Sequence, residues 1–270
     1  MPSLSPIVIK YGGNAMTEPA LRRRVAADIA KLRETRAPVV VHGGGPFIGE
    51  ALAKARIVST FVRGLRVTDD LSLPVIESVL TQLGKVLAQE IGGAVGLTGR
   101  DAELLVAEPL DAPSDIVLGH VGRVVEVNEE VLRRLLALPL TPVIACVAQT
   151  RGSGVLPAVL PDILNVNADS VAGAVAGALC APVIFLSNIP GVLDRPEDPE
   201  SLLGELSKRE VEARIADGRI AGGMIPKVEA ALEALDKGAR FAVIADGRVP
   251  GMLERALAGE AGTRVNLGDS

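Results

Sequence analysis

The chain has 270 residues, and 48% of them are hydrophobic, which is enough apolar side chain to fill a sizeable core. Its formal net charge of −5 argues against a nucleic-acid or membrane-surface partner, since either would favour a basic face. Aromatic residues make up 2% of the chain, so stacking on nucleobases is not expected.

Seven short apolar runs are typical of buried strands, and most of them end at Gly, Asn or Asp. They are PIVIK (6–10), PVVVHG (38–43), GAVGLTG (93–99), LLVAE (104–108), PVIAC (142–146), PVIFLSN (182–188) and FAVIADG (241–247). The segments 121–128 (VGRVVEVN) and 150–165 are interpreted as a hairpin or irregular strands inserted at an edge. The residues after Gly262 are expected to finish an edge strand.

Amphipathic patterns between these runs predict helices at 18–34, 46–55, 72–91, 128–136, 168–180, 208–216 and 227–237. This alternation predicts an α/β fold, a three-layer αβα sandwich with a mostly parallel central sheet, over a single domain of residues 1–270. The acid-rich stretch 194–201 (DRPEDPES) is interpreted as a solvated loop or lid.

Two cysteines, Cys146 and Cys180, each lie in an apolar stretch without CxxC or Cys/His spacing. We expect buried free thiols in a reducing compartment and no metal cage. The N-terminus has no basic segment followed by a long apolar run, and nowhere are there 18 consecutive apolar residues. The sequence therefore predicts a cytoplasmic protein.

In open α/β sheets, ligands bind beyond the carboxyl ends of the strands. The first predicted strand ends at Lys10 and is followed by Gly12 and Gly13; the second ends at His42 and is followed by Gly43–Gly45. Consecutive glycines let backbone N–H groups converge on an anion, although for one such loop alone a tight strand-to-helix turn is the favoured interpretation. Two such loops on two early strands favour an anion site.

Neither loop matches a common nucleotide motif. The P-loop requires GK[ST], which is missing, and Pro46 and Phe47 interrupt the dinucleotide fingerprint. No acidic residue ends the next strand, so an NAD-dependent oxidoreductase is excluded.

Two lysines occupy positions that suit an anion. Lys10 ends a strand beside a glycine turn, and Lys227 starts a late helix behind Gly222, Gly223 and Pro226. Either could be a solvated surface lysine. A cation near a helix N-terminus, however, opposes the helix dipole unless an anion binds there. The pair suggests a phosphate clamp.

Two further motifs carry candidate ligands. In FVRGLRVTDD, Arg66 suits a bidentate grip on a carboxylate, whereas Arg63 is compatible with a surface charge. The residues 68–70 are expected to cap the helix that follows. In LNVNADS, Asn167 or Asp169 caps the next helix, and a ligand role is equally favoured.

Seven segments, in order from about residue 7 to residue 252, resemble the amino acid kinase family. They are VIKYGGNAM, VVVHGGGPFIG, FVRGLRVTD, AVGLTGRDAEL, NVNADSVAGA, IPGVLD and DGRIAGGMIPKVEAAL. Within that family they are similar to the enzymes that phosphorylate N-acetyl-L-glutamate with ATP, the second step of arginine biosynthesis. The resemblance implies an N-terminal lobe, about 1–170, that binds the acyl amino acid and a C-terminal lobe, about 171–270, that binds ATP.

The resemblance also implies how the catalytic residues divide the work. Lys10 and Lys227 stabilise the charge on the phosphoryl group in transfer, and Asp169 holds both lysines in position. The nucleophile is a carboxylate that is already ionised at neutral pH, so no general base is needed. His42 is accordingly interpreted as shaping the glycine loop, and His120 as part of a hairpin.

For the substrates, the resemblance implies an acceptor site in which Gly44 and Gly45 contact the acyl amino acid and the phosphoryl group. Arg66 grips the α-carboxylate, and Asn165 binds the other end of the substrate. The nucleotide site is implied at Gly12, Gly13, Asn188, Gly191, Leu193, Arg219 and Ala221. Mg²⁺ is expected to bridge the phosphates of ATP, without a metal site built from protein ligands.

The chain departs from the family pattern at Asn188, where many relatives have an aspartate, at Leu87–Ala88, and in the poorly matching segment 148–164. Its tail is similar to that of a related kinase acting on aminoadipate or glutamate attached to an acidic carrier protein, and that alternative stays open. The motifs HGGGP and GGMIPK favour free acetylglutamate, and no basic cluster near Lys227 suits an acidic carrier. A regulatory protein without turnover is the other alternative, although the implied catalytic residues are all present.

A homodimer is expected, with the long apolar helix 72–91 as the candidate interface. Arginine-inhibited relatives carry an extra N-terminal helix that joins dimers into a hexamer. Because the first predicted strand begins at Pro6, we expect a dimer that is insensitive to arginine.

Overall fold

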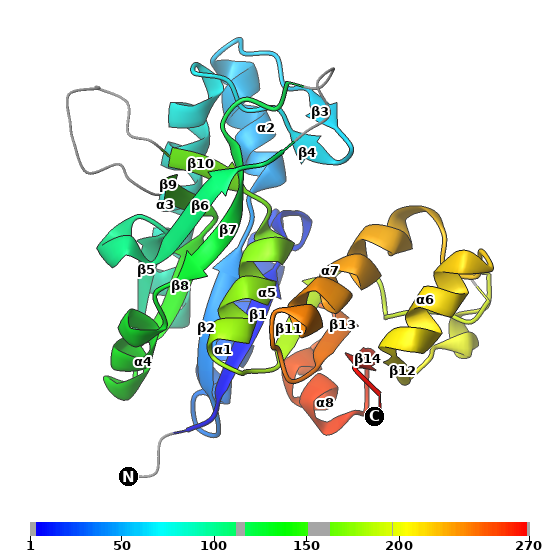
Figure 1. Ribbon diagram of the computed structural model, residues 1–270. Coiled ribbons are helices and arrows are strands. Elements are labelled where there is room, and N and C mark those ends of the chain that lie inside the picture. Colours follow the sequence, from blue (N-terminus) through cyan, green and yellow to red (C-terminus); the bar gives the residue numbers. More distant parts are fainter. Residues whose placement is uncertain (1–3, 112–116, 151–162, 196, 269–270) are drawn as a thin grey trace.

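The computed structural model describes residues 4–111, 117–150, 163–195 and 197–268. Within these residues, eight strands form one sheet in the order β12-β14-β13-β11-β1-β2-β8-β5, and neighbours are parallel except for β13 and β14. The strands are β1 (Pro6–Tyr11), β2 (Ala37–His42), β5 (Ala94–Thr98), β8 (Thr141–Ala145), β11 (Val183–Ser187), β12 (Glu205–Ser207), β13 (Ala242–Asp246) and β14 (Thr263–Asn266). The predicted mostly parallel sheet is confirmed (Figure 1).

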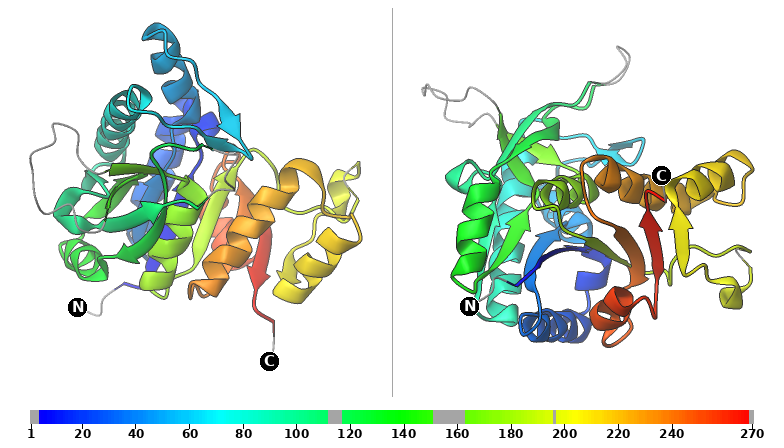
Figure 2. Two further views of the ribbon diagram at one scale, coloured as in Figure 1. Left: turned by 45° about the horizontal axis from the view of Figure 1, so that its top comes forward. Right: turned by 60° about the horizontal axis from the view of Figure 1, so that its bottom comes forward.

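Helices cover both faces of this sheet, so the three-layer αβα architecture is confirmed as well. They are α1 (Pro19–Leu32), α2 (Gly45–Lys54), α3 (Ser72–Ile91), α4 (Glu129–Ala137), α5 (Ala168–Ala178), α6 (Lys208–Ala216), α7 (Ile225–Asp236) and α8 (Met252–Ala258). Side chains of α1, α3 and α8 share one apolar core, and those of α4, α5, α6 and α7 share another on the opposite face. The right-hand view of Figure 2 shows the sheet enclosed between these layers.

The two cores follow from the alternation of side chains along each strand. In β1, Ile7 and Ile9 point into the core that contains α1, whereas Val8 points into the core that contains α5. All three side chains are fully buried. A strand buried on both faces reads as a continuous apolar run, which is why these strands were recognisable in the sequence.

Two expectations about the sheet are wrong. LLVAE does not join the parallel sheet, and VGRVVEVN is not an insertion at its edge. Together they supply β6 (Leu105–Pro109) and β7 (Val121–Val127) of a closed barrel that also contains β9 (Val147–Thr150) and β10 (Ile163–Val166). An apolar run reports burial but not the partner strand, and β6 pairs antiparallel with β7. Residues 151–162 of the predicted 150–165 segment lie outside the described residues.

Smaller corrections concern the C-terminal half and a thiol. The strand after Gly262, β14, is not at the edge, because β12 pairs on its other side. Helix α8 was not predicted.

Cys180 is exposed rather than buried, since α5 ends at Ala178 and Cys180 takes a left-handed φ of 48° that turns it outward. The described residues 194, 195 and 197–201 lie mostly at the surface and include a short 3-10 turn, Pro199–Ser201.

Helices α5 and α7 are packed unusually closely. A Cβ atom added at Gly177 would lie 2.1 Å from the carbonyl oxygen of Lys237, and one at Gly173 would lie 3.1 Å from Cα of Ala234. The run of small residues in α5 therefore lets the two backbones touch.

Across the described residues, none of the helices is both long and apolar enough to cross a membrane.

The end of β2 carries a histidine with no access to solvent. His42 is fully buried, and its Nδ1 donates to the carbonyl oxygen of Gly43 at 3.0 Å, while Nε2 finds no partner in the described part of the chain. Helix α3 closes over this ring at Gly84, where a Cβ atom would lie 2.9 Å from Nε2. Burial lowers the pKa of His42 to about 4, so the ring is neutral at neutral pH.

This burial predicts a loss of stability on acidification. Between pH 6.5 and 4 the unfolded chain binds a proton at His42 that the folded chain does not, so the free energy of unfolding falls as the pH falls. We expect a loss of about 2 kcal/mol between pH 7 and pH 5 from this residue. Urea unfolding of wild type and His42→Gln at both pH values would measure it.

In His42→Gln this part of the pH dependence should be absent. The matched control is His120→Gln, which removes a histidine whose side chain is 38% exposed and keeps His42. If His42→Gln loses as much stability as wild type on acidification, the assignment to His42 is wrong.

Candidate active site

The glycine loops that follow β1 and β2 lie against each other. A Cβ atom at Gly13 would stand 3.0 Å from the backbone nitrogen of Gly45, and one at Gly44 would stand 2.9 Å from Cδ2 of Leu80 in α3. Side chains at Gly13 and Gly44 would therefore force the loops apart or displace α3. Gly12 lies on the other side of β1, where a Cβ atom would be 3.3 Å from the carbonyl oxygen of Leu186 in β11.

Helix α2 begins at Gly45 inside this glycine cluster. Among the described residues, no side chain caps its N-terminus. The backbone N–H groups of a first helical turn lack helical partners, and together with the helix dipole they attract an anion. This end of α2 is the part of the cluster best suited to bind negative charge.

Helix α5 starts differently, because Asn167 caps it. The side-chain oxygen of Asn167 accepts from the backbone N–H of Asp169 at 2.7 Å and of Ser170 at 3.3 Å. Of the two residues predicted as caps, Asn167 therefore caps α5, and the carboxylate of Asp169 is available to bind another group.

That partner is Lys10. The ammonium of Lys10, at the end of the central strand β1, lies 2.9 Å from Oδ1 of Asp169, with 16% and 36% of the two side chains exposed. The pair joins the sheet to the first turn of α5. It holds a positive charge beside the glycine loops, since a Cβ atom at Gly12 would be 3.6 Å from Nζ of Lys10.

Lys227 is not brought into this pair. It is the third residue of α7 and is half-buried, and within the described residues its ammonium makes no ion pair or hydrogen bond. No described side chain caps α7 either. The structure thus joins Lys10 to Asp169 and leaves Lys227 available to another group. The close contact of α5 with α7 fixes the helix on which Lys227 stands.

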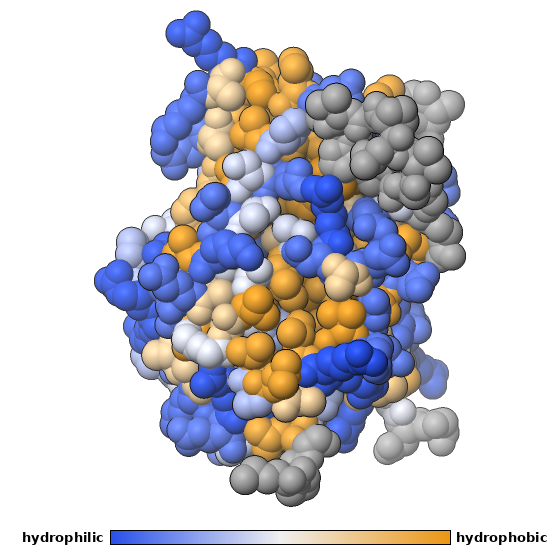
Figure 3. Space-filling view, turned by 90° about the vertical axis from the view of Figure 1, so that its left-hand side faces the viewer, coloured by the Kyte–Doolittle hydropathy of each residue, from blue (hydrophilic) through white to orange (hydrophobic). Residues whose placement is uncertain are grey.

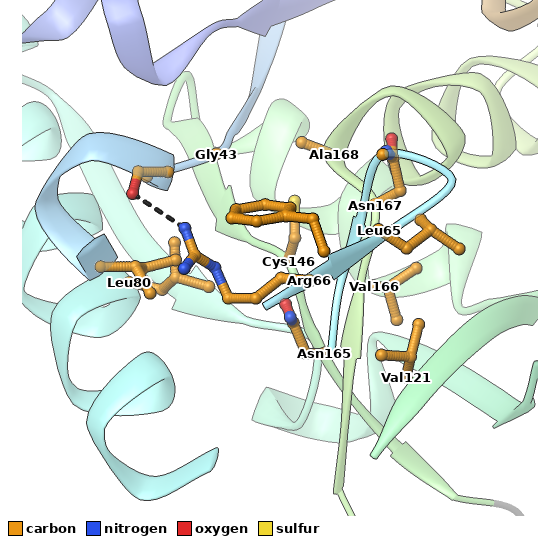
Figure 4. A pocket seen from close by; sticks show the side chains of 15 residues that line it. Gly43, Leu65, Arg66, Leu80, Val121, Cys146, Asn165, Val166, Asn167 and Ala168 are labelled. Atoms are coloured by element: carbon orange, nitrogen blue, oxygen red, sulfur yellow. Dashed lines mark hydrogen bonds between the residues drawn. The ribbon is translucent and has the colours of Figure 1, made fainter. Parts of the chain in front are cut away.

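A cavity of about 160 Å³ lies next to the glycine cluster, and the four residues predicted for the acceptor all line it. They are Gly44, Gly45, Arg66 and Asn165. Figure 4 shows Arg66 reaching across the cavity from the short hairpin that carries it, with Asn165 beside it. The structure therefore brings together residues that lie more than a hundred positions apart in the sequence.

Arg66 belongs to the hairpin formed by β3 (Phe61–Val62) and β4 (Leu65–Arg66). Its guanidinium carbon lies 4.5 Å from the centroid of the Phe61 ring, and its Nη2 donates to the carbonyl oxygen of Gly45 at 3.1 Å. Nη1 donates to the hydroxyl of Ser59. Burial lowers the pKa of Arg66 from its ordinary value, although an arginine remains charged. Sequence reasoning did not find Phe61 or Ser59, whose spacing to Arg66 carries no motif.

Cys146 also lines the cavity, which sequence reasoning missed. Its thiol donates to the carbonyl oxygen of His42 at 3.1 Å, and burial raises its pKa, so it is a neutral thiol. The available signal was its place directly after β8, at the carboxyl end of a parallel strand.

The residues predicted for the nucleotide beyond β11 form a separate group in the C-terminal half. Asn188 follows β11, and its carbonyl oxygen accepts from Arg248 at 2.8 Å. Gly191 is buried, and a Cβ atom there would lie 2.5 Å from Oγ1 of Thr263. Leu193 forms a bridge with Leu202.

The predicted residues near α7 are exposed. Arg219 is paired with Asp217 at 2.6 Å, and Ala221 immediately precedes the 3-10 turn Gly222–Met224 that leads into α7. Neither residue lines the cavity that contains Arg66 and Asn165. In the described residues, no group of three or more His, Cys, Asp or Glu side chains gathers as metal ligands would.

Comparisons of the sequence and of the fold with known proteins point to one family. The model of the amino acid kinase family matches residues 5–246. The chain is 51% identical over 259 residues to the acetylglutamate kinase of Deinococcus radiodurans, covering 96% of this chain and 99% of that protein. It is 44% identical over 251 residues to the acetylglutamate kinase of Cereibacter sphaeroides, covering 90% and 81%. The solved carbamate kinase of Giardia lamblia bound to AMP-PNP shares the fold, with a TM-score of 0.70 and 19% identity over 99% of this chain and 100% of that one.

Proposed function

The chain belongs to the amino acid kinase family, and from this premise we propose how its residues transfer the γ-phosphoryl group of ATP to the side-chain carboxylate of N-acetyl-L-glutamate. The chain is an enzyme, a kinase acting on N-acetylglutamate in arginine biosynthesis. The observation that carries the assignment of the site is the cavity that Arg66, Asn165 and the glycine loop line beside Lys10.

The acceptor binds in this cavity with its α-carboxylate on Arg66 and its other end on Asn165. Its side-chain carboxylate points to the N-terminus of α2 and to Lys10. An unperturbed carboxylate of this kind has a pKa of about 4.3, so it is ionised at neutral pH and attacks without a general base. This fits a site in which the nearby His42 and Cys146 are buried and neutral.

Catalysis then rests on positioning and on neutralising charge, because one anion must approach another in line. The N–H groups at Gly44 and Gly45 and the ammonium of Lys10 lie on the acceptor side of the phosphoryl group. Lys227 approaches it from α7, where its ammonium makes no ion pair with any described residue and can bind the phosphoryl group. Each such donor contributes a few kcal/mol to stabilising the transition state in a site that excludes water. Asp169 positions Lys10 through their ion pair.

The nucleotide lies on the C-terminal lobe, about 171–270, and the acceptor on the N-terminal lobe, about 1–170. Mg²⁺ would enter with ATP as part of the substrate, and its charge would offset that of the phosphates. Gly12 and Gly13 lie between the lobes, since Gly12 is next to β11 and Gly13 touches the acceptor loop. We place the enzyme in the cytoplasm, which agrees with two cysteines that are free in the described chain.

A panel of acceptors with Mg²⁺ and ATP tests the substrate. We expect turnover with N-acetyl-L-glutamate and little with glutamate, aspartate, carbamate or carrier-linked aminoadipate, because Arg66 and Asn165 bind both ends of one acylated amino acid. The rate of ADP release, measured for each acceptor, shows which of them is the substrate. Turnover restricted to the carrier-linked substrate would make the assignment wrong, although the relatives give no support to that alternative.

The two lysines are tested by Lys10→Ala and Lys227→Ala. Both should lower kcat by roughly a hundredfold or more while changing KM for either substrate much less, because they act on charge that develops in the transition state. The control is Lys54→Ala, which removes an exposed lysine of α2 paired with Glu50. Steady-state kinetics separates the two parameters, and an effect confined to KM would contradict the assigned role.

We further propose that two copies associate through the face that carries β5 and α3. In the described chain β5 is the edge strand of the sheet. The carbonyl oxygen of Gly96 and the amide nitrogen of Thr98 already bond to the side chains of Lys85 and Asp101, so side chains rather than strand pairing make this contact. Apolar side chains gather on this side of the molecule (Figure 3), and Val86 of α3 is 39% exposed. A twofold axis would bring the same patch of both copies together.

For this interface we expect sedimentation velocity to show a dimer. Val86→Glu should shift the population towards monomer, because it brings two like charges into an apolar contact. Leu267→Glu is the control, since Leu267 is also exposed but follows β14 near the opposite end of the sheet. A dimer that survives Val86→Glu unchanged would exclude α3 from the interface.

A further inference from the structure

A buried threonine joins the two residues proposed to bind the ends of the acceptor. Thr68 is fully buried, lies in the chain between the hairpin of Arg66 and helix α3, and is not among the residues that line the cavity. Its hydroxyl donates to the carbonyl oxygen of Arg66 at 3.0 Å and accepts from Nδ2 of Asn165 at 3.1 Å. One hydroxyl group thus contacts both the strand that carries Arg66 and the side chain of Asn165.

The two hydrogen bonds have a required direction. The carbonyl oxygen of Arg66 can only accept, so the single hydroxyl proton of Thr68 is committed to it. Towards Asn165 the hydroxyl oxygen can then only accept, which requires the amide to present Nδ2 rather than Oδ1. Thr68 therefore selects one of the two orientations of the Asn165 amide and holds its oxygen away from itself.

The backbone around Thr68 keeps the hydroxyl in place. The amide nitrogen of Thr68 donates to the carbonyl oxygen of Leu118 at 3.0 Å, and the amide nitrogen of His120 donates to the carbonyl oxygen of Thr68 at 2.6 Å. Gly119 permits this close approach because it has no side chain and takes a φ of +67°. A Cβ atom there would lie 2.2 Å from the carbonyl oxygen of Thr68. The next residue, His120, accepts from the amide nitrogen of Asn165 at 2.9 Å, so the same turn also holds β10.

We propose that Thr68 is a positioning residue for the acceptor, which sets the orientation of the Asn165 amide and ties it to the strand of Arg66. The inference rests on the proposed function, because it takes Arg66 and Asn165 as the residues that bind the acyl amino acid. Thr68 itself touches no substrate. Its effect passes through the two residues that do, so it concerns the binding of the acceptor and not that of ATP.

The decisive variant is Thr68→Val, which keeps the shape of the side chain and removes the hydroxyl. We expect KM for N-acetyl-L-glutamate to rise roughly tenfold, with kcat within about threefold of wild type and KM for ATP unchanged. Thr68→Ser restores both hydrogen bonds and should restore KM. An unchanged KM in Thr68→Val, or a Thr68→Ser as impaired as Thr68→Val, would overturn the proposal.

The matched control is Thr141→Val. Thr141 is also fully buried, but its hydroxyl has no hydrogen-bond partner among the described residues, and it lies at the first residue of β8. The same substitution there should leave both KM values unchanged. Thermal unfolding of each variant reports folding; if Thr68→Val does not fold, Thr68→Cys, which keeps a weaker donor and acceptor, should give a KM between those of wild type and Asn165→Ala.

A double-mutant cycle separates positioning from a general structural effect. If Thr68 acts largely through Asn165, Thr68→Val should raise the acceptor KM much less in an Asn165→Ala background than in wild type. If Thr68→Val raises the acceptor KM by the same factor in both backgrounds, the two residues act independently and the proposal fails. Wild-type turnover on acetylglutamate is measured first, because its absence would refute the proposed function rather than the role of Thr68.

Discussion

The ion pair between Lys10 and Asp169 is the interaction on which the rest of the site depends. It joins the end of the central strand to the first turn of α5, and both groups are partly shielded from water. The strand is held by hydrogen bonds to β2 on one side and β11 on the other, so the lysine has little freedom of position. Asp169 is available for this pair because Asn167 caps the helix in its place.

From that pair, close packing extends the arrangement to both halves of the molecule. The glycine loops after β1 and β2 touch at Gly13 and Gly45, which places the N-terminus of α2 beside Lys10. On the other side, glycines in α5 let α7 approach until the two backbones are in contact, and α7 carries Lys227. The glycine loops and α5 are thus held by close contacts and by the ion pair of Lys10 with Asp169, whereas Lys227 makes no ion pair within the described residues.

Much of the fold was predictable, because strands buried on both faces and amphipathic helices have local signatures. The predicted helix at 72–91 matches α3, Ser72–Ile91, to the residue. The errors arose where the hydrophobic pattern of a strand indicates that it is buried but not which strand it pairs with. LLVAE is as apolar as a sheet strand, yet it pairs antiparallel with β7 in the barrel, and β14 lies inside the sheet because β12, a strand of three residues, pairs outside it.

The sequence by itself determined the fold class, the family and the identity of the charged residues, since these depend on local periodicity and on motifs that are continuous in the chain. The tertiary structure decided which of these residues meet. It paired Asp169 with Lys10, placed Cys146 in the wall of the cavity, and put the hydroxyl of Thr68 between Arg66 and Asn165. Thr68 and Asn165 are 97 positions apart, and a hydrogen bond needs its two atoms within about 3 Å. Strand register and helix packing bring atoms that close, and no local pattern in the sequence specifies them.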